Sequence, residues 1–207
     1  MTLRGVLLCD GPSDMALAAV VEKLCFELGE PVVVTAIDPL VIQGRSVADR
    51  FAWLDHNESH FDLAFVHRDA EGSAPTLRRD EIVSVKPIST QVVPVVPVRM
   101  TEAWLILDEG AIRQVAGRPN GQKPLGLPKA TRAESVADPK SLLRHALESA
   151  AEPNGRRKAA RLRRDFGLHR KILLERLEPS GPVSQLESFQ QLRADLAAVL
   201  GTAPSHG

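Results

Sequence analysis

Acidic residues follow two apolar runs of this sequence, each shortly after the run ends. Asp10 comes directly after residues 6–9, and Asp69 and Glu71 follow residues 63–66. Ligands bind outside the carboxyl ends of the strands in open parallel sheets, so carboxylates at two such ends can converge on one divalent cation. The sequence therefore predicts that Asp10, Asp69 and Glu71 form one catalytic and metal-binding site, occupied by Mg²⁺ or Mn²⁺.

Each of these carboxylates also has a plainer structural interpretation. Asp10 could cap a helix or stabilise a turn, and Asp69 and Glu71 could form a solvated strand end. Asp14 could lie beside the metal or only favour the dipole of the helix that it begins. Glu102 is a predicted fourth metal ligand. Alternatively, its carboxylate is stabilised by the free N–H groups in the first turn of its helix.

Strand and helix patterns alternate over the part of the chain that would position these residues. Apolar β-forming runs and segments with apolar residues at helical spacing follow one another as 6–9, 17–28, 31–37, 46–56 and 62–67. This alternation predicts an α/β fold with a mostly parallel sheet flanked by helices. A further helix is expected near residues 76–85. Residues 91–98 favour β structure but contain two prolines, which cannot donate to a ladder, so we predict an edge strand there.

The second half of the sequence shows helix patterns and no strand signal. Thr101 begins one predicted helix, residues 117–129 are a loop rich in Gly and Pro, and Asp138 followed by Pro begins another helix. A last helix is expected over about 185–200. We therefore predict an α/β domain over residues 1–117 and a helical extension over 118–207 that packs on it.

Basic residues are concentrated in one segment of this helical extension. Only Asp165 and Glu175 oppose them nearby, so the segment is either an ordinary solvated helix face or a surface that follows a phosphate backbone. The second interpretation predicts nucleic-acid contact, with DNA or RNA, by Arg156, Arg157, Lys158, Arg161, Arg163, Arg164, Arg170 and Lys171.

The composition argues against a disulfide-rich protein and against a protein that spans a membrane. The formal net charge is zero, so nothing in the overall charge favours nucleic acid, and the two cysteines, Cys9 and Cys25, fit small buried hydrophobes in a reducing compartment. No run reaches the about 18 apolar residues of a membrane span, which predicts a cytoplasmic protein with no membrane partner. His56 and His60 are expected on the surface, and the tail after Gly201 is expected to fray.

Four segments together resemble a known family. They are residues 9–14 (CDGPSD), 100–108 (MTEAWLILD), 138–140 (DPK) and 187–192 (ESFQQL). These segments are similar to the Toprim-like family filed as domain of unknown function 4276. The acidic strand ends more broadly resemble Toprim domains, the metal-dependent catalytic modules of topoisomerases, primases and nucleases of the overcoming-lysogenization-defect type. The Glu-Ala-Trp-Leu run is the most specific of these matches.

The resemblance implies a Toprim/Rossmann-like fold and a Mg²⁺-dependent nuclease. In that activity Asp69 and Glu71 would hold the metal, and Asp10 would act as general base or further ligand. A separate ATPase subunit is an implied partner, as in a phage-defence system, because Toprim nuclease domains often work beside ATPase domains and this sequence has no ATPase motif of its own. The alternatives are a non-catalytic Toprim-like subunit of an ATPase complex and, less favoured, a small-molecule phosphotransfer enzyme.

Two positions depart from the usual Toprim pattern. Toprim domains carry Glu after the first strand and Asp-x-Asp after the later one, whereas this chain has Asp10 and the Asp69-Ala70-Glu71 segment. Both swaps keep the charge and change the reach of a carboxylate by one methylene. Because Mg²⁺ demands near-octahedral geometry at about 2.0–2.1 Å, such swaps could alter the choice of metal or weaken its binding.

Overall fold

The computed structural model describes residues 2–57, 61–85, 90–153 and 155–201. The predicted surface position of His60 and the predicted fraying after Gly201 therefore lie outside the described residues. His56, the last residue of its helix, is exposed as expected.

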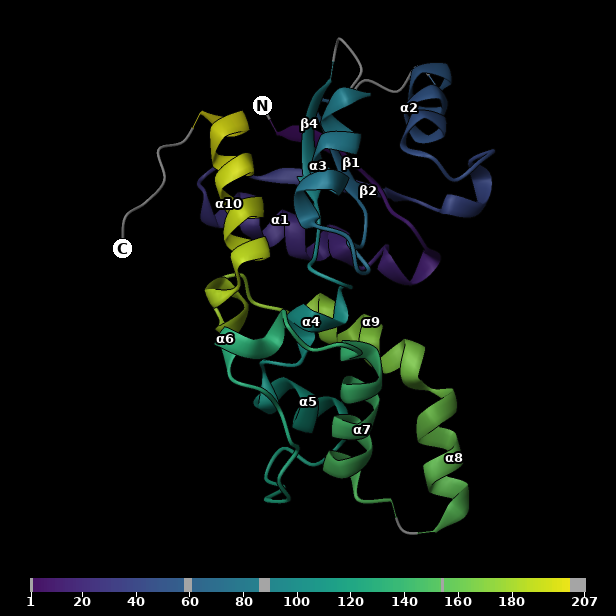
Figure 1. Ribbon diagram of the computed structural model, residues 1–207, viewed down its shortest axis with the longest axis vertical. Helices are drawn as coiled ribbons and strands as arrows, with labels where there is room; N and C mark the ends of the chain where they lie inside the picture. The colour runs from purple at the N-terminus through teal and green to yellow at the C-terminus, as the bar shows by residue number, and fades with distance from the viewer. Residues whose placement is uncertain (1, 58–60, 86–89, 154, 202–207) are drawn as a thin grey trace.

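The first half of the chain forms the predicted α/β unit (Figure 1). Its strands and helices alternate as β1 (Leu3–Leu8), α1 (Leu17–Glu27), β2 (Val32–Ile37), α2 (Val47–His56), β3 (Leu63–His67), α3 (Pro75–Ser84) and β4 (Gln91–Val95). All strand pairs are parallel, in the order β2-β1-β3-β4. The α/β prediction is confirmed, and β4 is the edge strand that its prolines predicted.

Helices cover both faces of this sheet, which explains why the strand sequences lack polar alternation. On one face, Leu7, Phe65 and Val93 belong to a core cluster with residues of α1 and α10. On the other face, Val6, Leu8 and Val66 pack with residues of α2 and α3. At the β4 end, the Arg79 guanidinium of α3 makes a bidentate ion pair with Asp195 of α10, so the two helices are joined across that edge.

The second half of the chain is helical, as predicted. Its helices are α4 (Glu102–Leu105), α5 (Glu109–Val115), α6 (Ala130–Ala133), α7 (Pro139–Ala151), α8 (Arg156–Arg164), α9 (Phe166–Arg176) and α10 (Glu187–Leu200). Asp138 caps α7 through Ser141 N, at 2.9 Å, as its sequence context indicates. No helix among the residues described is both long and apolar enough to cross a membrane.

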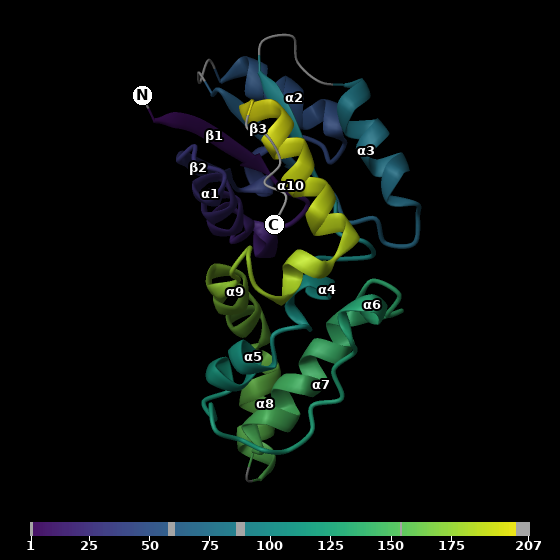
Figure 2. The same ribbon diagram turned by 90° about the vertical axis from the view of Figure 1, so that its left-hand side faces the viewer.

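The helices α4 to α9 lie beyond the carboxyl ends of the strands, whereas α10 returns to the sheet and packs beside β4 (Figures 1 and 2). One core cluster includes residues of the sheet, of α7, of α9 and of α10. Trp104 of α4 is 2% exposed, as its apolar context predicts, and donates through Nε1 to Ser188 Oγ of α10 at 2.9 Å. The boundary at residue 117 stays a prediction, and hydrophobic contacts cross it.

Both cysteines are free and buried, in agreement with the sequence prediction. Burial raises the pKa of each thiol to about 12, so both stay protonated and neither has the character of a reactive thiolate.

Candidate active site at the carboxyl ends of β1 and β3

The connections of the sheet create a crevice between β1 and β3. From β1 the chain passes through α1 to β2 on one side, and from β3 it passes through α3 to β4 on the other side. The strand order therefore reverses between these two neighbours, and in open α/β sheets ligands bind at the carboxyl ends at such a reversal. Asp10 follows the end of β1, and Asp69 follows the end of β3.

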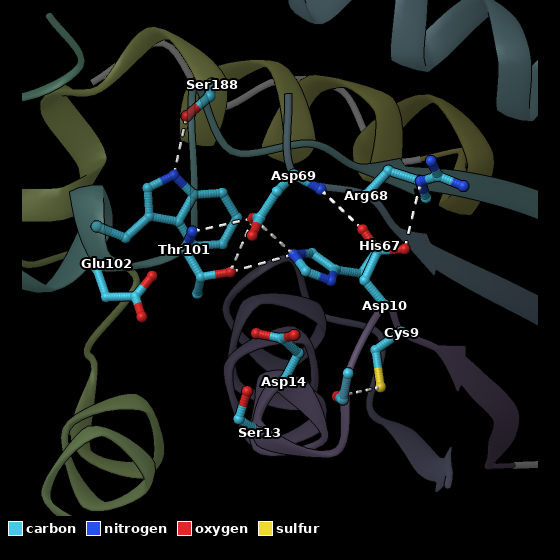
Figure 3. A network of polar contacts seen from close by, with 12 residues as sticks. Cys9, Asp10, Ser13, Asp14, His67, Arg68, Asp69, Thr101, Glu102 and Ser188 are labelled. Carbon is cyan, nitrogen blue, oxygen red and sulfur yellow. Dashed lines mark hydrogen bonds and ion pairs between the residues drawn. The ribbon is translucent and has the colours of Figure 1, made fainter. Parts of the chain in front are cut away.

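Asp10 and Asp69 meet at this crevice (Figure 3). The backbone N–H of Asp69 donates to Asp10 Oδ2 at 3.2 Å. Gly11, and not Asp10, is the N-cap residue of the short helix η1 (Pro12–Asp14), and no side chain caps that helix. The helix-cap interpretation of Asp10 is therefore wrong, and its carboxylate contacts the backbone of Asp69.

Two arginines neutralise Asp10. Arg50 Nη2 of α2 donates to Asp10 Oδ1 at 2.5 Å, and Arg68 Nε lies 3.3 Å from the same oxygen. Arg50 is only 4% exposed, and its Nη1 also donates to the His67 carbonyl at 3.0 Å. The Asp10 side chain, at 32% exposure, thus faces solvent on one side and a buried guanidinium on the other.

Thr101 and His67 orient Asp69. Asp69 Oδ1 accepts from Thr101 N at 3.0 Å and from Thr101 Oγ1 at 3.3 Å, and His67 Nε2 lies 3.2 Å from the same oxygen. Thr101 is the N-cap residue of α4, where the sequence predicts that a helix begins, but its side chain makes no capping bond and contacts Asp69 instead. No hydrogen bond from the described part of the chain reaches Asp69 Oδ2, so this oxygen is available to a ligand.

His67 is a buried titratable group within the site. Burial lowers its pKa, but the Asp69 hydrogen bond and the charges of Asp69, Asp14 and Asp10 outweigh burial, and the net shift is upward. Its Nδ1 is buried and lacks a hydrogen-bond partner among the described residues. The imidazole therefore serves as a support behind Asp69, with its charge favoured by the surrounding carboxylates.

A second, fully buried ion-pair cluster adjoins the first. Arg170 of α9 donates from Nε to Glu102 Oε1 at 2.9 Å, from Nη2 to Asp14 Oδ1 at 2.5 Å, and from Nη1 to the Ser13 carbonyl. Arg170, Glu102 and Asp14 are 4%, 3% and 6% exposed. Glu102 directly follows Thr101, which contacts Asp69 (Figure 3). The cluster joins the turn after β1 to α4 and α9, at the base of the crevice.

The remaining acidic residues predicted for the metal site are placed differently. Glu102 lies in the first turn of α4, as predicted, and its carboxylate forms an ion pair with Arg170. Glu71 is exposed, has a φ of 56°, and donates its N–H to the Arg99 carbonyl at 2.7 Å. Over the described ranges, no three or more His, Cys, Asp or Glu side chains form a group that could hold a metal ion. The structure thus brings together Asp10 and Asp69 and leaves Glu71 outside.

Most of the predicted basic set lies far from this crevice. Helix α8 occupies the end of the helical half that is remote from the sheet (Figures 1 and 2). Its six basic residues and Lys171 are exposed, with Arg161 and Arg164 paired to Asp165 and Arg163 to Glu148. Arg170 does not belong to that surface: it is buried by its ion pairs, so its assignment to nucleic acid was wrong.

The spacing of Arg50 and Arg170 from apolar residues in their helices indicates that both are buried. Arg170 stands four residues after Phe166 and three before Leu173, and all three are buried on one face of α9. Arg50 likewise stands three residues after Val47 and four before Leu54 in α2. Because residues at these spacings share a helix face, each arginine sits on an apolar face, where a cation requires a partner.

Comparisons of the chain with models of protein families, with curated proteins and with solved structures give no match. The α/β fold and its parallel sheet therefore stand on the topology described above. The family resemblance noted in the sequence remains a prediction and contributes only to the proposal that follows.

Proposed function

We propose that the protein is a Toprim-like, divalent-cation-dependent enzyme that cleaves phosphodiester bonds in DNA or RNA. The observation that carries this proposal is the contact between Asp10 and Asp69 at the crevice between β1 and β3. The similarity of the acidic strand ends and of the Glu-Ala-Trp-Leu segment to Toprim-like proteins supports the same activity.

The donors at the crevice suit a cation site completed by substrate. Mg²⁺ is commonly bound through one or two carboxylates together with waters and substrate phosphates, and not by a cage of protein ligands alone. Asp69 Oδ2 and the solvent-facing side of Asp10 meet this requirement. A third protein carboxylate is missing from the described cluster, as is usual for sites that substrate completes. Asp69 would be the main ligand, and Asp10 would share its charge between the cation and Arg68.

The residues of the chain itself have separable roles. Thr101 and His67 hold the Asp69 carboxylate through Oδ1, which leaves Oδ2 without a hydrogen bond from the described residues. Arg50 and the N–H of Asp69 hold Asp10 beside it, where Asp10 can accept a proton from an attacking water. Arg68, at 16% exposure, lies where it can stabilise charge on a phosphate. A divalent cation bound there would polarise the phosphate and lower the pKa of the water.

Binding of Mg²⁺ or Mn²⁺ is expected to raise the melting temperature, because only the folded chain brings Asp10 and Asp69 together. At ten times its dissociation constant the cation would add about 1.4 kcal/mol, or roughly 3–6 °C for a domain of this size. Asp69→Asn should abolish the rise, and Asp80→Asn, in an exposed position of α3, is the matched control. A wild-type melting curve independent of both cations up to tens of millimolar, measured by calorimetry, would contradict the cation site.

A non-catalytic subunit that binds an ATPase is the second candidate. One observation favours it: the carboxylates of Asp10 and Glu102 are each already paired with an arginine, as expected of an acidic site retained for structure. The two candidates differ in one measurable property, because only the enzyme loses activity when Asp69 loses its charge. A stable complex with an ATPase encoded nearby, unaffected by Asp69→Asn and free of cleavage, would favour the subunit.

If α8 contacts phosphates, its unpaired basic residues should carry most of the interaction. Arg156, Arg157 and Lys158 form no ion pair with any described residue, whereas Arg161, Arg163 and Arg164 each pair with a carboxylate. Replacing the first three with Gln should weaken DNA or RNA binding at every sequence and lower the salt slope by about one per lost contact.

Replacing the paired trio with Gln is the comparison for this experiment, with affinities measured by fluorescence anisotropy over a salt series. We expect a smaller loss from that trio, because its charges are partly neutralised in the free protein. An unchanged affinity and slope in both triple variants would make α8 an ordinary solvated helix.

A further inference from the structure

A cleft opens beside Asp10. It has a volume of about 460 Å³ and is formed by the turn after β1, the loop after β2 and the start of α2. This volume lies within the range of about 300–1,000 Å³ that is typical of small-molecule sites. Asp10 lines both the cleft and the crevice between β1 and β3, so the two spaces share a side chain.

One wall of the cleft is apolar. Pro12 comes from the turn after β1, and Pro39 and Leu40 come from the short helix η2 (Pro39–Val41) that follows β2. Leu40 is 80% exposed, so its apolar surface is accessible to a molecule in the cleft. Apolar side chains of this kind offer a surface for the flat face of a ring.

Two arginines also line the cleft. They are Arg45 and Arg50, and Arg50 is held by Asp10 and the His67 carbonyl. Arg45 is exposed and forms no ion pair within the described segments. Arg45 therefore offers the cleft a guanidinium that is not ion-paired with any described carboxylate, and this group favours an anionic ligand.

The backbone that carries Arg45 is tightly constrained. Gly44 has a φ of 100°, and a Cβ built on it would lie 2.2 Å from the Asp49 carboxylate, so only glycine fits. Ser46 and Asp49 form a reciprocal capping box at the start of α2. The backbone of Arg45 is therefore constrained by Gly44 on its N-terminal side and by the capping box on its C-terminal side.

We propose that this cleft is a nucleotide subsite, in which the ring packs on Pro39 and Leu40 while Arg45 binds the phosphate. This inference rests on the proposed function, since it places one nucleotide unit of the substrate next to the site of cleavage at Asp10 and Asp69. A bare anion would not use the apolar wall, and an uncharged ring would not use Arg45. The combination of the apolar wall and Arg45 selects a nucleotide.

Isothermal titration of the full chain in EDTA, without any divalent cation, tests the subsite separately from catalysis. The probes are thymidine 5′-monophosphate, thymidine and inorganic phosphate. We expect the monophosphate to bind at least about tenfold more tightly than either of the others. Arg45→Gln should weaken the monophosphate by about tenfold, and Leu40→Asp should weaken both the monophosphate and thymidine. Arg132→Gln, an exposed arginine of α6, is the control and should change nothing.

Three results would overturn the subsite: no binding of the monophosphate, equal binding of phosphate and monophosphate, or no effect of Arg45→Gln and Leu40→Asp. Because Leu40 and Arg45 are exposed, neither variant should unfold the chain, and circular dichroism confirms this. The outcomes are distinct from those of the proposed function. If the wild type binds the nucleotide but cleaves nothing, the subsite is supported and the nuclease is contradicted. If it cleaves but does not bind the nucleotide, the nuclease is supported and the subsite is contradicted.

Discussion

Arg170→Met is expected to lower the free energy of unfolding by about 3–5 kcal/mol, the usual result of removing one partner from a buried ion pair. The substitution keeps the length of the side chain but leaves Asp14 and Glu102 buried, at 6% and 3% exposure, without a counter-ion. It also removes the donor to the Ser13 carbonyl. Urea unfolding followed by circular dichroism measures the change.

The matched control is Lys171→Met, in the next position of α9. Lys171 is exposed and lies 3.7 Å from Glu175, a surface pair whose loss should matter by no more than about 0.5 kcal/mol. A triple variant, Arg170→Met with Asp14→Asn and Glu102→Gln, should recover much of the lost stability, since no uncompensated charge remains. If Arg170→Met is as stable as Lys171→Met, the buried cluster does not hold the turn after β1 to α4 and α9.

Asp69→Asn is expected to reduce cleavage at least about 100-fold, the lower range for loss of a group that acts directly on the reaction. Asparagine keeps a side-chain oxygen that can accept from Thr101 N, so the fold around α4 should persist. What is lost is the negative charge on Oδ2, which cation binding requires. Asp10→Asn should also abolish cleavage, but it deprives the buried Arg50 of its counter-ion, so its stability must be measured alongside.

Thr76→Ala, in an exposed position at the start of α3, is the control for a nonspecific loss of activity. That variant should cleave at the wild-type rate. Glu71→Gln tests the third predicted carboxylate: because Glu71 is exposed and outside the described cluster, we expect it to keep most of the activity. A collapse of activity in Glu71→Gln equal to that in Asp69→Asn would mean that Glu71 joins the site when substrate binds.

The fold could be predicted from the sequence because its main signals are local. Residues 63–66 and 31–37 are apolar without alternation, which occurs when helices cover both faces of a strand, and the prolines near residue 94 favour an edge. The proximity of Asp10 and Asp69 followed from the same reasoning, because parallel strands end at one edge.

The counter-ions of the site could not be predicted in the same way. Arg50 is 40 positions from Asp10, and Arg170 is 156 positions from Asp14, so only tertiary packing brings these charges together. In the sequence, Arg170 is adjacent to a run of exposed basic residues and resembles them in composition. Arg170 differs from these residues in one local feature, its position on the apolar face of α9. An interpretation based on charge alone does not use this feature.

The conformation of Glu71 could not be predicted from the spacing of the acidic residues. Side chains two residues apart point to the same side of the chain only where the strand conformation continues. Here the chain leaves β3 at His67, and Glu71 adopts a φ of 56° in the turn that follows. The turn ends the strand conformation on which the predicted alignment of Asp69 and Glu71 depends.

The central claim is that Asp10 and Asp69 form a cation-dependent phosphodiester-cleaving site, and a cleavage assay tests it most directly. Wild type and Asp69→Asn are incubated with single- and double-stranded DNA and RNA, in Mg²⁺, in Mn²⁺ and in EDTA, alone and with a candidate ATPase. We expect cleavage of at least one substrate by the wild type in Mg²⁺ or Mn²⁺, none in EDTA, and cleavage at least about 100-fold slower by Asp69→Asn. The claim would be contradicted by an equal absence of cleavage in both proteins, or by wild-type cleavage that persists in EDTA and in Asp69→Asn.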